Sequence, residues 1–359
     1  MCATRVLIVE DSATMRARLR AVLDSDPDID VVGEAADGKQ AIALCQQIRP
    51  DVITMDMMLP VMSGLAATEY IMAHCPTPIL IVSASVNRGE LFKTYEALSA
   101  GAVDVMDKPR GDESDRKWER DFLATVALVA RIRVITHPRG RLDRSDSPAA
   151  LKTRSTPTIP IGRGPFEMVA IGASTGGPGA IVEVLRGLPS SFMIPVIVVL
   201  HIGASFGAAF ADWLDGQTSR RVDYAVDGQP MSDAVGRVIM APPDHHLEIR
   251  GARLYLTNGP ERHFCRPSVD VLFESVATEY GPNAAACLLT GMGRDGAAGL
   301  AAVRHNGGLT IAQDEETSVV YGMPREAVLL GAVEHILALE KIGPALSTLT
   351  DARQSPARS

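Results

Sequence analysis

Short apolar runs alternate with helix-period segments along the first part of the chain. Runs of consecutive apolar residues predict buried strands at residues 6–9, 29–32, 52–53, 79–82 and 103–106. Apolar residues spaced three and four apart predict helices at residues 15–23, 39–48, 65–73, 91–100 and 118–135. Five strand–helix units of this kind predict an α/β fold, a doubly wound (βα)5 parallel sheet with helices on both faces.

The pattern breaks at residues 137–163, which hold four prolines among Ser, Thr and scattered charges and predict a flexible linker. A second alternation follows, with strands predicted at 166–171, 195–200 and 284–289 and helices at 180–187, 206–214 and 269–280. Residues 254–256 predict a further strand that ends in a turn at Asn258-Gly259. We therefore expect one α/β domain at 1–136, a linker at 137–163, a second doubly wound α/β domain at 164–350 and a disordered tail at 351–359.

Composition narrows the class of protein. The chain has 359 residues, of which 46% are hydrophobic, 22% charged and only 4% aromatic, which excludes disorder over the whole chain and favours α/β domains. The net charge is −8, with −5 on residues 1–136 and −8 on residues 164–350. Because neither domain has a basic excess, we expect no nucleic-acid binding, and a DNA-binding regulator is disfavoured.

The cysteine spacing and the length of the apolar runs indicate where in the cell the protein is expected. The five cysteines are widely spaced and never form Cys-x-x-Cys, so we expect free thiols in a reducing compartment: Cys2, Cys45, Cys75, Cys265 and Cys287. The acidic pair Glu10-Asp11 comes too soon for a signal peptide, and the apolar run 196–200 is far too short for a membrane span. We therefore expect a cytoplasmic protein without membrane insertion.

Chemically active side chains follow the predicted strands of the first domain: Glu10 and Asp11, Asp56, Ser83, and Lys108. The carboxyl ends of parallel strands meet at one edge of a sheet, so these side chains converge there. Clustered carboxylates suit Mg²⁺, and a lysine with a hydroxyl completes a phosphoryl site. Taken singly, Asp11 or Ser12 also fits a helix N-cap, Asp56 a turn, and Lys108 a solvated lysine.

These residues stand in stretches that resemble the receiver domains of bacterial two-component response regulators: residues 6–12, 55–65, 82–84 and 101–109. The resemblance covers about residues 4–135. It implies that Asp56 accepts a phosphoryl group from a histidine kinase, and that Mg²⁺ is held by Asp11, Asp56 and the Met58 carbonyl, with Glu10 acting through water. It also implies that Ser83 and Lys108 contact the phosphoryl oxygens.

Two residues depart from the receiver pattern. Ser63 stands where an acidic residue usually precedes the glycine, and Val105 stands where many receivers carry a switching aromatic residue. Aromatic-coupled switching is therefore disfavoured here, whereas phosphorylation is still expected.

A glycine-rich loop, residues 172–179, follows the first strand of the second domain. It lacks Gly-x-Gly-x-x-Gly, and Pro178 replaces the lysine of a phosphate-binding loop. Gly172-x-Ser174-x-Gly176 fits the turn that exposes a serine nucleophile, although Ser174 alone fits a helix cap equally well.

A serine nucleophile needs a base and an orienting carboxylate. His201 directly follows the predicted strand 195–200, and Asp295 lies in the turn after 284–289, so a parallel sheet brings both to the edge that carries Ser174. Alone, His201 fits a core or turn histidine and Asp295 a loop residue. The order Ser, His, Asp differs from that of α/β-hydrolases. A metal alternative lacks any recognised ligand spacing: Asp244, His245, His246, His263 and Cys265.

The second domain resembles the catalytic domain of chemotaxis protein-glutamate methylesterases over about residues 165–345. The matching stretches are 171–179, 241–246, 265–270, 289–299, 313–314 and 320–327. The resemblance implies that Ser174 is the nucleophile, His201 the base and Asp295 its orienting acid, with oxyanion donors near Thr175 and Met292 and no esterase cofactor. Residues 202–206 depart from the family pattern beside the base.

Together the two resemblances imply a phosphorylation-regulated esterase that hydrolyses glutamyl γ-methyl esters on chemoreceptors, in which the unphosphorylated receiver restricts access to the catalytic cleft. The implied partners are methyl-accepting receptors and a chemotaxis histidine kinase. Alternatives stay open: glutamine deamidation, a receiver-gated serine hydrolase outside chemotaxis, or a receptor adaptor without catalysis. The complete set of Ser174, His201 and Asp295 disfavours the adaptor.

Overall fold

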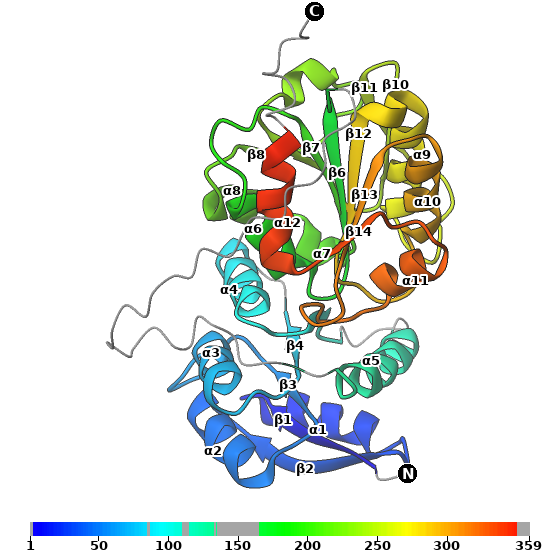
Figure 1. The fold of residues 1–359 in the computed structure, drawn as a ribbon. Helices are drawn as coiled ribbons and strands as arrows, with labels where there is room; N and C mark the ends of the chain where they lie inside the picture. The colour runs from blue at the N-terminus through cyan, green and yellow to red at the C-terminus, as the bar shows by residue number, and fades with distance from the viewer. Residues whose placement is uncertain (1–2, 85–86, 110–114, 133, 135–164, 350–359) are drawn as a thin grey trace, which may run out of the picture. The chain divides into compact units, whose positions relative to one another are not determined.

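The computed structural model describes residues 3–84, 87–109, 115–132, 134 and 165–349. The chain divides into two compact units, Met1–Ala149 and Ala150–Ser359 (Figure 1). The predicted linker and the predicted tail lie outside the described residues, and the domain boundaries stay predictions.

The first unit contains a five-stranded parallel sheet, as predicted, in the order β2-β1-β3-β4-β5. Its strands are β1 (Thr4–Val9), β2 (Ile29–Ala35), β3 (Val52–Met55), β4 (Ile79–Ser83) and β5 (Asp104–Asp107). Its helices are α1 (Ala13–Leu23), α2 (Gly38–Ile48), α3 (Gly64–His74), α4 (Arg88–Ser99) and α5 (Asp115–Val129). The last helix ends at Val129, so its predicted extension to residue 135 is wrong.

Helices cover both faces of this sheet, with α1 beside α5 and with α2, α3 and α4 in a row (Figure 1). The core under α2–α4 is made of strand residues that are buried almost completely, such as Leu7, Ile53 and Ile81. Burying both faces explains why these strands are continuous apolar runs.

The second unit is built on a seven-stranded parallel sheet in the order β14-β13-β12-β6-β7-β9-β8. Its strands are β6 (Met168–Ala173), β7 (Val196–Leu200), β8 (Val222–Tyr224), β9 (Val238–Met240), β12 (Ala284–Leu288), β13 (Leu309–Gln313) and β14 (His335–Leu337). The sequence predicted three of these strands. The other four are at the sides of the sheet, and three of them, β8, β9 and β14, have only three residues each.

Helices again lie on both faces of the sheet, with α6 against α12 and with α9, α10 and α11 packed together (Figure 1). The helices are α6 (Gly177–Arg186), α7 (Ala204–Gly207), α8 (Phe210–Gln217), α9 (Val269–Tyr280), α10 (Ala297–His305), α11 (Met323–Leu329) and α12 (Leu339–Ser347). A hairpin of β10 (His246–Arg250) and β11 (Arg253–Thr257) packs against α9 and joins its core.

Two predictions in this unit are wrong in detail. The predicted helix 206–214 is two helices, because Gly207 interrupts it. Gly207 packs so closely against Pro243 that a Cβ on Gly207 would lie 2.4 Å from the Pro243 Cγ, and the Gly207 carbonyl accepts a hydrogen bond from the Tyr224 hydroxyl. The predicted turn at Asn258-Gly259 lies instead at the other end of β11, where Gly251 and Ala252 both have positive φ, 53° and 55°. Two consecutive left-handed residues form the tight turn that hairpins favour.

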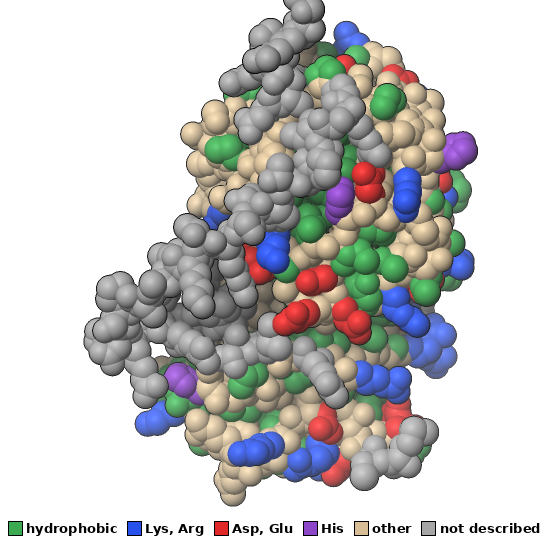
Figure 2. Space-filling model, in the orientation of Figure 1, with side chains coloured by type: hydrophobic (Ala, Val, Ile, Leu, Met, Phe, Trp, Pro, Cys, Tyr) green, Lys and Arg blue, Asp and Glu red, His purple; other side chains and the backbone are tan. Residues whose placement is uncertain are grey.

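Within the part of the chain that the structure describes, no helix has the length and apolarity needed to cross a membrane. On the face shown in Figure 2, basic and acidic side chains lie interspersed with polar and apolar ones in each unit.

Candidate functional sites

The acidic residues of the first unit lie where the strand order reverses. The chain leaves β1 toward β2 on one side and returns through β3 on the other. Glu10 follows β1 and Asp56 follows β3, and β1 and β3 are hydrogen-bonded neighbours. Ligand crevices of doubly wound sheets open at this position. One carboxylate oxygen each of Glu10, Asp11 and Asp56 lies within 4.8 Å of the others.

A lysine neutralises part of this cluster. The Nζ of Lys108, just beyond β5, lies 2.8 Å from Oε2 of Glu10 and 2.9 Å from Oδ2 of Asp56. Glu10 and Asp56 are buried, whereas Asp11 is exposed. Burial raises the pKa of Glu10, and the hydrogen bond from Lys108 opposes that rise without cancelling it. Burial lowers the pKa of Lys108, but its bonds to Glu10 and Asp56 outweigh burial and raise that pKa overall.

The donor set fits a hard cation. Three carboxylates converge with no nitrogen or sulfur ligand among them, and Mg²⁺ prefers such oxygen ligands. Asp56 also accepts a hydrogen bond from the Met58 backbone N–H at 3.3 Å, which orients its carboxylate. The Met58 side chain is exposed in the loop after Asp56, and the role of its carbonyl as a Mg²⁺ ligand stays a prediction.

Local contacts define the structural roles of several residues around this site. Ser12, and not Asp11, caps α1 by accepting a hydrogen bond from Met15 N, and Ser63 caps α3 in the same way through Ala66 N. Ser83 is buried at the end of β4, where its carbonyl accepts the Lys108 backbone N–H at 3.1 Å. Val105 lies half-buried against the core of α2–α4.

Gly64 is a residue whose role the sequence did not reveal. A Cβ at this position would lie 2.0 Å from the carbonyl oxygen of Asp56. The first turn of α3 can therefore approach the loop after β3 only because residue 64 lacks a side chain.

In the second unit, the strand register brings Ser174 and His201 side by side. β6 and β7 pair in parallel with Ala173 opposite Leu200, and the His201 backbone N–H donates to the Ala173 carbonyl at 3.0 Å. Ser174 does not cap α6, because the N-cap is Gly176, which has φ 77° and no capping side chain. Among the described residues, the half-buried Ser174 makes no hydrogen bond from its hydroxyl to His201.

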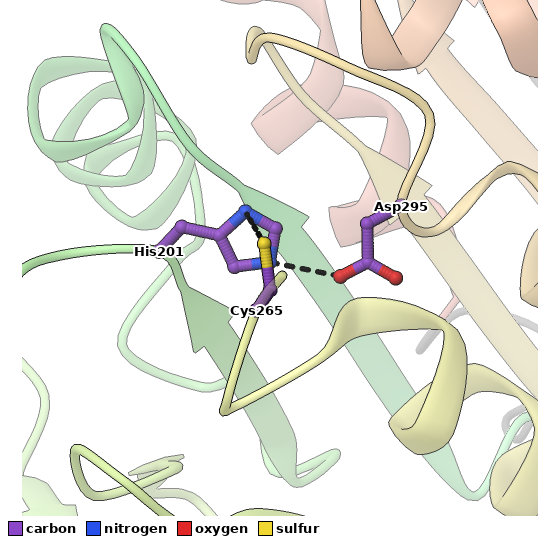
Figure 3. Close-up of side chains that lie close together, drawn as sticks. All are labelled: His201, Cys265 and Asp295. Carbon is purple, nitrogen blue, oxygen red and sulfur yellow. Dashed lines mark hydrogen bonds and ion pairs between the residues drawn. The ribbon is translucent and has the colours of Figure 1, made fainter. Parts of the chain in front are cut away.

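The structure does bring His201 and Asp295 together. The Nε2 of His201 lies 2.8 Å from Oδ2 of Asp295, and its other ring nitrogen, Nδ1, lies 3.6 Å from Sγ of Cys265 (Figure 3). The three side chains come from separate segments: the end of β7, the loop before α9, and the loop after β12. The His201 side chain is 12% exposed and that of Asp295 only 2%.

The beginning of α9 holds the Asp295 carboxylate. Oδ1 accepts hydrogen bonds from the Ser268 hydroxyl at 2.8 Å and from Asp270 N at 3.1 Å, and Oδ2 accepts one from Val269 N at 2.7 Å. Amides at a helix N-terminus stabilise a negative charge. The sequence did not predict these hydrogen bonds to Asp295, although Ser268 before an apolar helical segment is a recognisable capping signal.

These contacts tune both partners of the pair. Burial raises the pKa of Asp295, but its hydrogen bond with His201 and those from Ser268 and Val269 lower that pKa overall. Burial lowers the pKa of His201, whereas Asp295 and Cys265 outweigh burial and raise it to about 9. The imidazole therefore favours its protonated form below about pH 9, and Asp295 holds it by Nε2, so that Nδ1 is the nitrogen that must lose a proton before it can act as a base.

The loops around Ser174 fit one another closely. The Ser174 N–H donates to the Thr290 carbonyl at 3.0 Å, and the Thr290 hydroxyl donates to the Thr175 carbonyl at 3.0 Å. A Cβ on Gly291 would lie 2.7 Å from the Ser174 Cβ, so glycine is required there. Met292, the next residue, leaves 52% of its side chain exposed, whereas Thr175 is buried.

The alternative metal cluster is not assembled. His246 uses both ring nitrogens locally, accepting from Ser268 N at 3.1 Å and donating to the Pro260 carbonyl at 3.0 Å. His245 bonds the Pro243 carbonyl, and His263 bonds Asp270. Within the described residues, no three of the five proposed ligands bring their ligand atoms together.

The two units define a class of protein: an α/β domain with the acidic site of a signal receiver, joined in one chain to an α/β domain with the histidine–carboxylate pair of a hydrolase. Comparison with known families agrees. The response regulator receiver domain model matches residues 6–115, and the CheB methylesterase model matches residues 169–346.

Relatives extend the similarity to nearly the whole chain. It is 41% identical to protein-glutamate methylesterase/protein-glutamine glutaminase 2 of Anaeromyxobacter dehalogenans, covering 96% of this chain and 97% of that protein. It is 40% identical to the enzyme of the same description from Nitrosospira multiformis, covering 97% of each chain. The chain therefore belongs to the protein-glutamate methylesterase/protein-glutamine glutaminase family. Among solved structures, the Thermotoga maritima CheB methylesterase catalytic domain is 34% identical, with a TM-score of 0.49 over 51% of this chain and 98% of that one.

Proposed function

We propose that this chain is a serine esterase that hydrolyses glutamate γ-methyl esters on chemoreceptors to glutamate and methanol, under the control of phosphorylation at Asp56. One observation carries the catalytic part of the proposal. The Nε2 of His201 lies 2.8 Å from Oδ2 of Asp295. This pair lies at the ends of the strands, next to Ser174, which directly follows β6. The substrate is supported by the similarity to protein-glutamate methylesterases.

The first half-reaction uses the nitrogen that Asp295 leaves available. Ser174 Oγ attacks the ester carbonyl carbon while its proton passes to Nδ1 of His201. Asp295 keeps the other proton on Nε2 and stabilises the imidazolium that forms. Because Nδ1 faces Cys265 in this structure, the Ser174 hydroxyl replaces that thiol contact when substrate binds.

The tetrahedral intermediate needs hydrogen-bond donors aimed at its oxyanion. We assign this role to backbone N–H groups near Thr175 and Met292, which flank Ser174 in two loops joined by the Thr290 hydroxyl. Removing one such donor typically costs about 3–4 kcal/mol of transition-state stabilisation. The exposed Met292 side chain and the loop 202–206 then border the path of the receptor peptide.

Collapse of the intermediate returns the proton from His201 to the leaving methanol. Water, with His201 again as the base, then hydrolyses the glutamyl-serine ester and frees Ser174. The same steps acting on glutamine would release ammonia. The relatives are also named as protein-glutamine glutaminases, which favours deamidation as a second candidate activity.

In the receiver unit, Asp56 is the phosphoryl acceptor, and a chemotaxis histidine kinase is its donor. Glu10, Asp11, Asp56 and the Met58 carbonyl would hold Mg²⁺, whose charge offsets that of the incoming phosphoryl group. Lys108 already contacts Asp56 and would stay beside the phosphoryl oxygens, with the hydroxyl of Ser83 at the end of the neighbouring strand.

The test measures methanol release from membranes that carry methyl-labelled receptors. We compare the full chain with Ser174→Ala and Asp56→Asn, each with and without acetyl phosphate and Mg²⁺. We expect Ser174→Ala to abolish release, and Asp56→Asn to keep basal release while losing its response to acetyl phosphate. Ser190→Ala is the matched control for Ser174→Ala, because Ser190 is exposed and precedes the start of β7, the end of the strand away from His201. Asp30→Asn is the matched control for Asp56→Asn, because Asp30 is exposed on β2.

The outcomes separate the alternatives. Release that needs Ser174 and ignores acetyl phosphate keeps the esterase and refutes the regulation. Ammonia without methanol points to a deamidase. Binding to receptors with neither product refutes the enzyme and favours an adaptor.

A further inference from the structure

A thiol lies against the ring nitrogen that catalysis needs. The Sγ of Cys265 is 3.6 Å from Nδ1 of His201, and Asp295 holds the opposite ring nitrogen (Figure 3). The side-chain ligand atoms of these three residues all lie within 4.8 Å of one another. A thiol, an imidazole and a carboxylate in this sequence of contacts can pass a proton from sulfur to nitrogen, because the carboxylate stabilises the imidazolium.

The loop that carries Cys265 is held firmly. Arg262 and Cys265 exchange backbone hydrogen bonds of 3.1 and 2.9 Å around a two-residue turn, His263-Phe264, in which both residues have positive φ. The Arg262 guanidinium binds Glu274 of α9 through two bonds of 2.5 and 2.6 Å. The thiol is therefore positioned by the fold beside the imidazole.

The other described cysteines differ in environment. Cys287 is buried inside β12, and burial raises its pKa. Cys45 and Cys75 lie 3.6 Å apart, sulfur to sulfur, in the first unit, and Cys75 is half-buried. Cys265 is half-buried, so a small reagent can reach it, and it has a base within contact distance. Thiolates with both features are the reactive ones in proteins.

We propose that Cys265 is a modification site for low-molecular-weight disulfides, and that the mixed disulfide formed there switches off hydrolysis by covering Nδ1 of His201. This inference rests on the proposed role of His201 as the base.

The chemistry is an exchange of one disulfide for another. The proton of the Cys265 thiol moves to Nδ1 of His201, and the thiolate attacks one sulfur of the reagent. The sulfur–sulfur bond of the reagent breaks as the new bond forms, and the departing thiolate takes up the proton. Cys265 is oxidised, one half of the reagent is reduced, and an added thiol reverses the exchange.

The experiment treats the full-length protein with glutathione disulfide. Peptide mass spectrometry gives the rate of modification at each cysteine, and methanol release from labelled receptor membranes gives activity. We expect Cys265 to react about tenfold faster than Cys75, and His201→Gln to slow Cys265 about tenfold without changing Cys75. We also expect modified enzyme to lose about nine-tenths of its methanol release and dithiothreitol to restore it.

The variants Cys265→Ser and Cys265→Ala separate this thiol from the others, with Cys75→Ala as the matched control in the first unit. Each treated sample is compared with its own untreated sample, so a change in basal rate does not matter. We expect both Cys265 variants to resist the reagent and Cys75→Ala to remain sensitive.

Several results would overturn the proposal. Full methanol release from protein modified at Cys265 refutes the switch, and equal modification rates with and without His201 refute activation by the imidazole. Inhibition that persists in Cys265→Ser places the effect at another cysteine. If untreated protein releases no methanol, the proposed function and the switch both fail, and the modification rates alone still decide whether Cys265 is an activated thiol.

Discussion

Replacing Asp295 by asparagine tests the geometry of the hydrolase site most directly. The carboxylate accepts four hydrogen bonds, from His201, Val269 N, the Ser268 hydroxyl and Asp270 N. An asparagine side chain has one oxygen and one NH₂ group, so it can satisfy the donors on one side only.

Either orientation of the amide leaves a backbone N–H facing another donor. An unsatisfied buried N–H costs about 1–3 kcal/mol, and we expect Asp295→Asn to lower the free energy of unfolding by roughly that amount. If the NH₂ group faces His201, it also forces the ring proton onto Nδ1, the nitrogen that must accept a proton from Ser174. Wrong tautomers of this kind cost about 10³–10⁴ in kcat, or about 4–5.5 kcal/mol.

The assay combines kcat for methanol release with the urea unfolding midpoint of the same samples. Asp244→Asn is a suitable control, because Asp244 is exposed and has a φ of 60°, a conformation that asparagine tolerates. A folded Asp295→Asn protein with kcat within about tenfold of the native value would refute the role of the pair. A matching loss in Asp244→Asn would show that the effect is not specific to the site.

Three further predictions follow from the contacts and pKa shifts. Because the pKa of His201 is raised to about 9 and the base must be unprotonated, kcat/KM should rise with pH from 7 toward 9, and a profile that is flat above pH 7 would contradict this. Lys108→Met removes the partner that lowers the pKa of Glu10, and the pKa of Glu10 should therefore rise further. Carboxyl NMR titration measures this pKa, and an unchanged titration of Glu10 would refute the contact. Gly64→Ala places a Cβ 2.0 Å from a backbone oxygen and should destabilise the first unit by about 1–3 kcal/mol in urea unfolding. Gly89→Ala on α4, where a Cβ would meet only Asn87 Oδ1 at 3.4 Å, should not; equal effects would refute the packing argument.

All five strands of the first sheet were predicted, its edge strands included, whereas in the second sheet the sequence predicted the central strands and missed those at the sides. Strands such as β1, β4 and β7 are buried on both faces, so their apolar runs are unmistakable. β8 and β14 are short strands at the two edges of their sheet, with half-exposed residues and no long apolar run to reveal them.

Ser174, His201 and Asp295 were proposed from the sequence because each follows a central strand of the second sheet. The residues that hold these side chains in place were not predicted, since they come from elements distant in the sequence. Nothing near Asp295 shows that the first turn of α9 will hold its carboxylate, and nothing near Cys265 shows that its sulfur will reach His201. Contacts of this kind depend on how loops close over a sheet, which periodicity does not encode.

The central position of β6 also bears on synthesis of the protein. β6 takes β7 as one neighbour and β12, which begins at Ala284, as the other. A growing chain therefore keeps one edge of β6 open while the residues up to β12 are translated, and open edges invite association with other chains. His201 and Asp295 are 94 positions apart, so a ribosome that stops between them releases a product with the nucleophile loop and the histidine but without the carboxylate that orients it. Truncated products are therefore expected to be prone to aggregation and to lack the activity of the finished enzyme.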